Sequence, residues 1–185
     1  MSTEDKISDL TLVKQALSEL PYVTTSYAKL MVRYQRLLRH VCTGVLINHS
    51  SLDDSVQDVM LKVFHKLSNF EERASFKTWL MKIAVNVCIS YNRKALREAG
   101  YIVEANDHLK ESVASEAVPV TEGDSFQNLI QALNEEERQI ITLKFVAEIE
   151  FKEIAHILDL GLSATKMRYY RAIEKLKVSG QFVSK

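Results

Sequence analysis

The sequence predicts an all-α protein in which two small helical domains are joined by a flexible linker. Its 185 residues include only 5 glycines and 2 prolines, which is too little turn chemistry for a sheet of many strands. Apolar residues recur at helical spacing along most of the chain, and one acidic segment interrupts that pattern. We therefore place the first domain at residues 1–100, the linker at 101–125 and the second domain at 126–185.

Four helices are expected in the first domain, at about residues 7–19, 24–47, 52–68 and 75–97, and short connections favour a compact bundle. Ser50 and Ser51 are candidate caps for the third helix. One face of this helix is apolar, and the other mixes acids, an amide and a leucine: Asp53, Asp54, Gln57, Asp58 and Leu61. Such a mixture suits a protein interface, although single exposed leucines are also common.

The fourth helix lies in the segment SFKTWLMKIAVNVCISYNRKALR and has two different faces. Its apolar residues follow the spacing of one buried helical face. The other face is a polar and cationic stripe of Lys82, Asn86, Ser90, Arg93 and Arg97. A solvated face would usually carry interspersed acids, and their absence here favours an anionic partner.

Phe70 stands in the short loop SNFEERASF, directly before the cationic helix. An aromatic ring in this position would suit a stacking platform for an unpaired nucleic-acid base. A plug of the hydrophobic core is the alternative, and residue type alone favours it.

Residues 101–125 contain 1 basic and 6 acidic side chains, together with Pro119 and Gly123, and show no helical period. We read them as the linker.

Cys42 and Cys88 lie among apolar residues, which predicts buried free thiols in a reducing compartment. The histidines near Cys42 lack the paired spacing of a metal site, so none is expected.

Several function classes find no support in the sequence. A Gly-rich phosphate loop and a nucleophile with a base at motif spacing are both missing, so we expect neither an enzyme nor a cofactor. The apolar runs are too short for a membrane span and the N-terminus lacks a signal-peptide core, which predicts a cytoplasmic protein without membrane insertion.

The second domain ends in a pattern typical of a helix-turn-helix. FKEIAHIL and LSATKMRYYRAIEKLK are joined by the short turn DLG, and the second segment is strongly basic. We expect its inward face to be Leu162, Tyr169, Ala172, Ile173 and Leu176. The residues expected to meet duplex DNA are Ser163, Lys166, Met167, Arg168, Tyr170, Arg171 and Lys175.

Four segments in order, DDSVQDVMLKVFHKL, SFKTWLMKIAVN, LNEEERQIITLKFV and FKEIAHIL, resemble the sigma-70 family of bacterial RNA polymerase sigma factors. The resemblance is to the extracytoplasmic-function (ECF) group and spans about residues 20–178. It implies sigma domain two, a variable linker and sigma domain four. The implied function is to bind core RNA polymerase and to direct promoter-specific initiation.

The resemblance also implies roles for the residues singled out above. Asp53, Asp54, Gln57, Asp58 and Leu61 would dock on the β′ clamp of the polymerase, and the β flap is a second expected contact. Phe70 and Asn86 fall on positions that contact the melted minus-ten element, with support from Lys82, Ser90, Arg93 and Arg97. Lys166, Met167, Tyr170 and Arg171 fall on positions that read the minus-thirty-five element. Many members of the group are held by an anti-sigma factor, which makes such a protein a candidate partner.

Three positions depart from the family pattern. Ser55 stands where an apolar residue is usual, Asp159 replaces the usual turn glycine, and SELPYVTT lacks the usual glycine-acid turn.

Two other functions stay open beside that of a sigma factor. A stand-alone helix-turn-helix regulator would need no cationic face after Phe70. A protein adaptor would use only the acidic helix.

Overall fold

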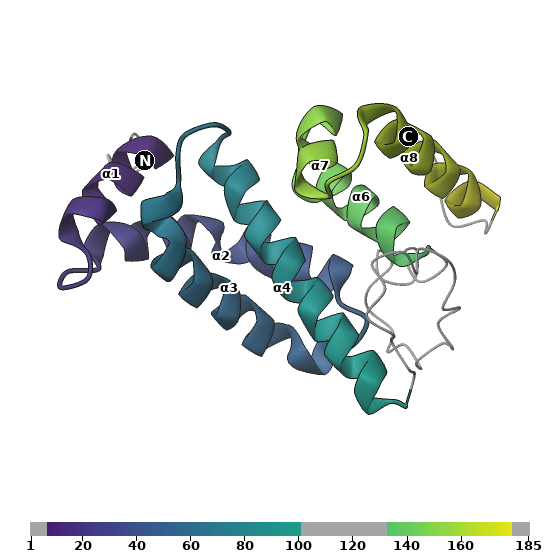
Figure 1. The fold of residues 1–185 in the computed structure, drawn as a ribbon, viewed down its shortest axis with the longest axis horizontal. Coiled ribbons are helices and arrows are strands. Elements are labelled where there is room, and N and C mark those ends of the chain that lie inside the picture. Colours follow the sequence, from purple (N-terminus) through teal and green to yellow (C-terminus); the bar gives the residue numbers. More distant parts are fainter. Residues whose placement is uncertain (1–6, 101–132, 179–185) are drawn as a thin grey trace.

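The computed structural model describes residues 7–100 and 133–178, and every regular element within these ranges is a helix (Figure 1). The first range contains α1 (Asp9–Glu19), α2 (Thr25–Val45), α3 (Leu52–Lys66) and α4 (Phe76–Glu98). Two short 3-10 turns, His49–Ser51 and Leu67–Asn69, flank α3. The second range contains α6 (Glu135–Phe145), α7 (Phe151–Ile157) and α8 (Leu162–Val178). The all-helical prediction is confirmed.

Local side-chain bonds fix where the helices begin. Ser8 accepts a hydrogen bond from the backbone N–H of Thr11, and Ser75 accepts one from Thr78 at 3.0 Å, so both serines cap helices. The cap expected for α3 does not form at Ser51, because the side chain of this residue makes no capping bond. Asn48 instead accepts from the N–H of Ser50 and starts the 3-10 turn that leads into the helix.

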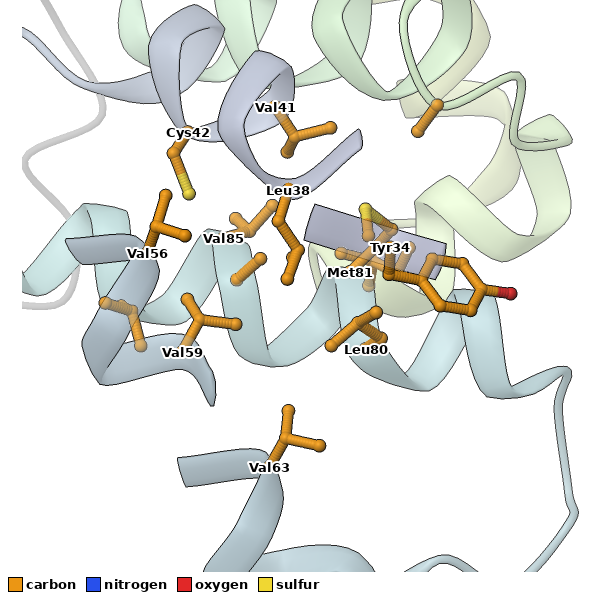
Figure 2. Packing of buried hydrophobic residues seen from close by; sticks show 14 of the residues in the cluster. Tyr34, Leu38, Val41, Cys42, Val56, Val59, Val63, Leu80, Met81 and Val85 are labelled. Atoms are coloured by element: carbon orange, nitrogen blue, oxygen red, sulfur yellow. The ribbon is translucent and has the colours of Figure 1, made fainter. Parts of the chain in front are cut away.

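The core of the first four helices is mainly aliphatic (Figure 2). Leu38 of α2 lies among Val59 and Val63 of α3 and Leu80 and Val85 of α4, all 0–1% exposed. The two thiols are buried and free, as predicted. Because Cys42 and Cys88 share a hydrogen bond, the buried Cys88 thiol has a raised pKa and stays protonated.

Within residues 133–178 the structure describes three helices, α6, α7 and α8. A capping box starts α6, since Asn134 accepts from the N–H of Glu137 and Glu137 accepts in return from the N–H of Asn134. The helices α7 and α8 form the helix-turn-helix. A small cluster that includes Leu133, Ile141, Ala172 and Leu176 holds α8 on α6.

The two parts pack against each other, with α6 beside α2 and α7 beside α4 (Figure 1). The main hydrophobic cluster runs continuously from the first four helices into residues of α6 and α7 such as Ile140 and Ile154. Gly44 permits the approach, because a Cβ at this position would lie 2.5 Å from Oγ1 of Thr142.

The predicted linker, residues 101–125, lies outside the described residues, and the proposed domain boundaries stay predictions. Within the described ranges, none of the helices is both long and apolar enough to span a bilayer.

Candidate nucleic-acid interface

The cationic stripe of α4 is exposed along its C-terminal half. Asn86, Ser90, Arg93 and Arg97 all reach solvent. Ser90 Oγ donates to the carbonyl of Asn86 at 2.9 Å, and Arg97 Nε donates to the carbonyl of Arg93 at 3.3 Å. These bonds lie within one helix face. The surface therefore offers an amide and two guanidinium groups on a rigid scaffold.

Lys82, at the start of the same stripe, is half-buried, with 31% of its side chain exposed. Its Nζ lies 3.0 Å from Oδ1 of Asp159 and donates to the carbonyl of His156 at 3.2 Å. Both partners belong to α7 and the turn after it. At this residue the stripe meets the second part of the chain, while Lys82 keeps part of its side chain in solvent.

Phe70 is half-buried and belongs to an aromatic group. Its ring centroid lies 5.7 Å from that of Phe76 and 5.4 Å from that of Trp79. The ring thus packs against the hydrophobic core and also keeps part of its surface accessible. These contacts fit a plug of the core, and the stacking role stays a prediction.

The acidic face of α3 is exposed at Asp53, Asp54, Gln57 and Leu61, with 51% of Leu61 accessible. Asp58 is half-buried and accepts a hydrogen bond from the hydroxyl of Tyr91 at 2.8 Å. Partial burial, followed by this bond, raises the pKa of Tyr91 to about 12. Asp58 is therefore held in place by α4, and the other four side chains present a surface.

Ser55, the polar departure in α3, points away from that surface. It is fully buried, and its hydroxyl donates to the carbonyl of Leu52 at 2.8 Å. Because the hydroxyl bonds its own helix, the core accepts it without an unpaired polar group. The departure thus leaves the acidic face intact.

The outward side of α8 carries most of the residues predicted to meet duplex DNA. Ser163, Lys166, Met167, Tyr170 and Arg171 are exposed. Two further members face the supporting helix instead. Arg168 Nε lies 2.7 Å from Oε2 of Glu136, and Lys175 Nζ lies 2.7 Å from Oε1 of Glu137.

One inward residue of α8 was predicted wrongly. Leu162 is 42% exposed, whereas Thr165 is fully buried and donates from its hydroxyl to the carbonyl of Gly161 at 3.0 Å. The polar Thr165 satisfies its hydroxyl within the first turn of the helix and so enters the core. The other expected inward residues are buried or half-buried.

The turn before α8 takes its shape from Asp159. This residue has a φ of 52°, the left-handed conformation usual for the glycine that it replaces. Aspartate tolerates this conformation better than most residues. The turn therefore forms, and it carries a carboxylate that reaches α4.

Sequence reasoning missed a groove at the start of the helix-turn-helix. An open depression of about 330 Å³ is lined by Lys144, Glu150, Phe151, Lys152, Leu162 and Lys166. Lys144 Nζ donates to the carbonyl of Ile149 at 3.3 Å and lies 4.9 Å from the centre of the Phe151 ring. The missed signal was that Lys144, in the last turn of α6, and Lys152, in the first turn of α7, stand close together at the start of the motif.

Comparisons with known protein families place both parts of the chain. The model described as "Sigma-70 region 2" matches residues 30–98. The model described as "Sigma-70, region 4" matches residues 129–178. The first contains the faces of α3 and α4, and the second contains the helix-turn-helix.

Relatives of known function align over most of the chain. The ECF RNA polymerase sigma factor SigW of Bacillus subtilis (strain 168) is 24% identical over 165 residues, which cover 82% of this chain and 87% of that protein. The ECF RNA polymerase sigma-E factor of Escherichia coli (strain K12) is 28% identical over 158 residues, covering 80% and 82%.

Two solved structures share the fold. CnrH, in complex with the cytosolic domain of CnrY, has a TM-score of 0.66 and 22% identity, covering 92% of this chain and 95% of that chain. The sigma factor RpoE, in complex with the anti-sigma factor NepR from Bartonella quintana, has a TM-score of 0.66 and 24% identity, covering 84% and 96%. The chain belongs to the ECF group of the sigma-70 family, whose members direct promoter-specific transcription initiation by RNA polymerase and are not enzymes.

Proposed function

We propose that this sigma factor works through three separate surfaces: α3 docks on core RNA polymerase, α4 holds the melted minus-ten element, and α8 reads the minus-thirty-five element as duplex. The partners are core polymerase and promoter DNA, and the expected location is the bacterial cytoplasm, where both are found. The observation that carries the proposal is the presence, in one chain, of an exposed cationic face on α4 and a basic helix-turn-helix.

Docking on the polymerase is assigned to Asp53, Asp54, Gln57 and Leu61. Their exposure supports a contact with the β′ clamp, because an apolar side chain ringed by acids fits a mixed protein surface. Asp58 acts from a position fixed by Tyr91. The β flap is the expected contact of the second domain.

Capture of the melted strand is assigned to the stripe of α4. Asn86 would bond an exposed base edge, and Arg93 and Arg97 would bond phosphates. Ser90 and Lys82 would add hydrogen-bond donors, and Phe70 would stack a base on its open side.

A single captured base is insufficient to keep the duplex open. Unstacking costs a few kcal/mol per step, and stacking on an aromatic ring returns about 1–3 kcal/mol per base. Contacts with the polymerase and with the minus-thirty-five duplex must supply the difference. This is why the three surfaces belong to one mechanism.

Duplex recognition is assigned to Ser163, Lys166, Met167, Tyr170 and Arg171, which share the outward side of α8. We assign Arg168 and Lys175 a supporting role, because their ion pairs with α6 fix the orientation of the helix. Lys144 and Lys152 in the groove would add phosphate contacts beside Lys166.

An anti-sigma factor is a candidate regulatory partner, because the RpoE structure named above contains one. Purification of the chain from its native cell with a polymerase-free partner would support this assignment. Recovery with core polymerase alone would contradict it.

Run-off transcription with core polymerase on genomic promoter fragments tests the proposal. We expect specific initiation that depends on the added protein and that is weakened by Asn86→Ala and by Arg171→Ala. Gln35→Ala and Arg36→Ala, at exposed positions of α2, serve as matched controls and should initiate normally. Tight duplex binding without polymerase, combined with no initiation on any fragment, would instead identify a stand-alone helix-turn-helix regulator.

A further inference from the structure

The loop that carries Phe70 presents two carboxylates beside the surface assigned to an anionic strand. Glu71 and Glu72 directly follow Phe70, and both side chains are exposed. Like charges at this place would repel the phosphates of a strand whose base stacks on the ring. A strand-holding loop therefore needs positive charge close to both acids.

Each of these acids has a cation within ion-pair distance. Nη2 of Arg73, in the same loop, lies 2.5 Å from Oε2 of Glu71. The cation beside Glu72 comes from another helix, because Nζ of Lys14 in α1 lies 3.5 Å from Oε1 of Glu72. Lys14 is the only basic residue in the sequence of α1, DLTLVKQALSE. A helix outside the α4 stripe thus brings one positive charge to the loop.

The helix α1 is fixed at this end of the bundle by its own buried residues (Figure 1). Leu12, Val13 and Ala16 are 0–2% exposed, and the helix packs against the 3-10 turn Leu67–Asn69, which leads into the loop. Two residues of chain span at most about 7 Å, so the backbone of Glu72 stays near that of Phe70. The fold itself therefore places α1 beside the loop.

The ammonium group of Lys14 is available to another anion. The side chain of Lys14 is 62% exposed and that of Glu72 is 49% exposed, and ion pairs this open to water contribute little to stability. Leu10 and Leu17 lie one turn before and one turn after Lys14 on the same face, and both are exposed. Apolar neighbours reduce the local screening by water, which strengthens the attraction between the ammonium group and a phosphate.

We propose that Lys14 is a further strand-binding residue, whose ammonium group leaves Glu72 and binds a phosphate of the melted minus-ten strand beside the base at Phe70. The inference rests on the proposed function, because it extends the same strand-holding surface. The Phe70 ring packs on Phe76 and Trp79 in the first turn of α4. The surface thus runs from the α4 stripe across this ring to α1, and two helices hold the strand.

Binding of a single-stranded oligonucleotide to the protein in complex with core polymerase tests this contact. The probe is the fluorescent non-template minus-ten strand of a promoter identified by run-off transcription. Lys14→Gln should weaken binding about 1.5- to 5-fold, the effect expected for one exposed ion pair. The slope of log affinity against log salt should become shallower by about 0.7, because one phosphate contact with a single strand is lost. Lys14→Arg keeps the charge and should bind like the unmodified chain.

Glu72→Gln separates a phosphate contact from a purely structural role of Lys14. If Lys14 exchanges partners, loss of the carboxylate frees its ammonium group and should tighten binding about 1.5- to 5-fold. If the ion pair only holds the loop in place, Glu72→Gln should weaken binding as Lys14→Gln does. Arg36→Gln removes one exposed positive charge from α2 and is the matched control, which should bind like the unmodified chain.

Photocrosslinking locates the contact on the DNA. A photoreactive side chain at position 14, in the complete polymerase–promoter complex, should label the non-template strand next to the nucleotides that are labelled from position 70. Unfolding in urea checks the fold of the variant. Because Lys14 is exposed, Lys14→Gln should keep the unfolding midpoint of the unmodified chain.

The outcomes separate this contact from the function on which it rests. The role of Lys14 would be overturned if Lys14→Gln bound like Arg36→Gln, or if Glu72→Gln bound as weakly as Lys14→Gln, even where Asn86→Ala weakens binding. Normal binding and normal initiation by Asn86→Ala would instead overturn the function proposed for α4. Weaker binding of Lys14→Gln, tighter binding of Glu72→Gln and a crosslink from position 14 to the minus-ten strand support the contact.

Discussion

Gly44→Ala probes the contact between α2 and α6 at its tightest point. The new Cβ would lie 2.5 Å from Oγ1, 2.7 Å from Cγ2 and 3.2 Å from Cβ of Thr142. Thr142 is β-branched, so these atoms lie next to its backbone and have little freedom to move. Overpacking of this kind costs about 1–3 kcal/mol. Alanine in a helix gains about 0.5–1 kcal/mol over glycine, so the net loss of unfolding free energy is up to about 2.5 kcal/mol.

The clash lies at the contact between α2 and α6, so movement of the two parts of the chain away from each other would relieve it. With nitroxide labels at Arg36→Cys and Lys177→Cys, one on each part of the chain, Gly44→Ala should therefore lengthen the distance between the two labels. Thr142→Ala removes two of the three clashing atoms, Oγ1 and Cγ2, so the double variant should regain the shorter distance between the labels. A double-mutant cycle on the urea unfolding free energy should give a coupling of about 1–3 kcal/mol. The reasoning would be refuted if the effects of the two substitutions on the unfolding free energy added within about 0.5 kcal/mol. An unchanged distance between the labels in Gly44→Ala would also refute it.

Three further predictions concern the first domain. Ser75→Ala should lower the urea unfolding free energy by about 0.5–2 kcal/mol, because α4 loses its cap. Ser51→Ala loses no capping bond and should lower this free energy much less. Equal losses in the two variants would contradict the capping assignment. Asn92→Ala should lower the unfolding free energy by about 1–3 kcal/mol in the same assay. The buried amide accepts from the N–H of Ile47 at 2.9 Å and donates to the carbonyl of Val45 at 3.0 Å, and both bonds are lost. An unchanged free energy would show that water replaces these bonds. Two hydrogen bonds from Ser26 lower the pKa of Glu19, so its stabilising contribution is present at neutral pH and lost as the pH falls through the lowered pKa. Glu19→Gln should therefore lose less stability between pH 7 and acid pH than the unmodified chain, and identical pH profiles would rule out this contribution.

Helix positions and buried faces could be predicted because apolar periodicity reports them directly. The helix α4 begins at Phe76, close to the expected start, and the inward residues Leu80, Ala84 and Cys88 are buried. The exposed stripe from Asn86 to Arg97 followed from the same period. The cap of α4 was not predicted, although Ser75 is of a residue type that is typical of this position.

The contact between the domains could not be predicted, because a polar face on a helix looks the same whether water or another domain covers it. Lys82 and Thr78 belong to the polar side of α4, and their partners stand far away in the sequence at Asp159 and Glu153. Nothing in the local pattern distinguishes Lys82 from Arg93. The burial of Arg138 has the same origin, since charged residues are rarely expected inside.

Errors at helix ends have a different cause. Ser51 was expected to cap α3, but Asn48 initiates a 3-10 turn three residues earlier, and sequence propensity does not separate these two candidates. Leu162 occupies the first turn of α8, where the apolar period predicts burial although 42% of the side chain is exposed at the rim of the groove. Thr165 takes the inward position because its hydroxyl bonds the backbone.

The central claim is that α4 holds the melted minus-ten strand while α8 reads the minus-thirty-five duplex. Site-specific photocrosslinking in the complete polymerase–promoter complex tests it most directly, with a photoreactive side chain placed at Asn86 in one variant and at Arg171 in another. The account predicts that position 86 labels the non-template strand of the minus-ten element and that position 171 labels the minus-thirty-five duplex. Labelling of one common segment from both positions, or of polymerase with no DNA, would contradict it.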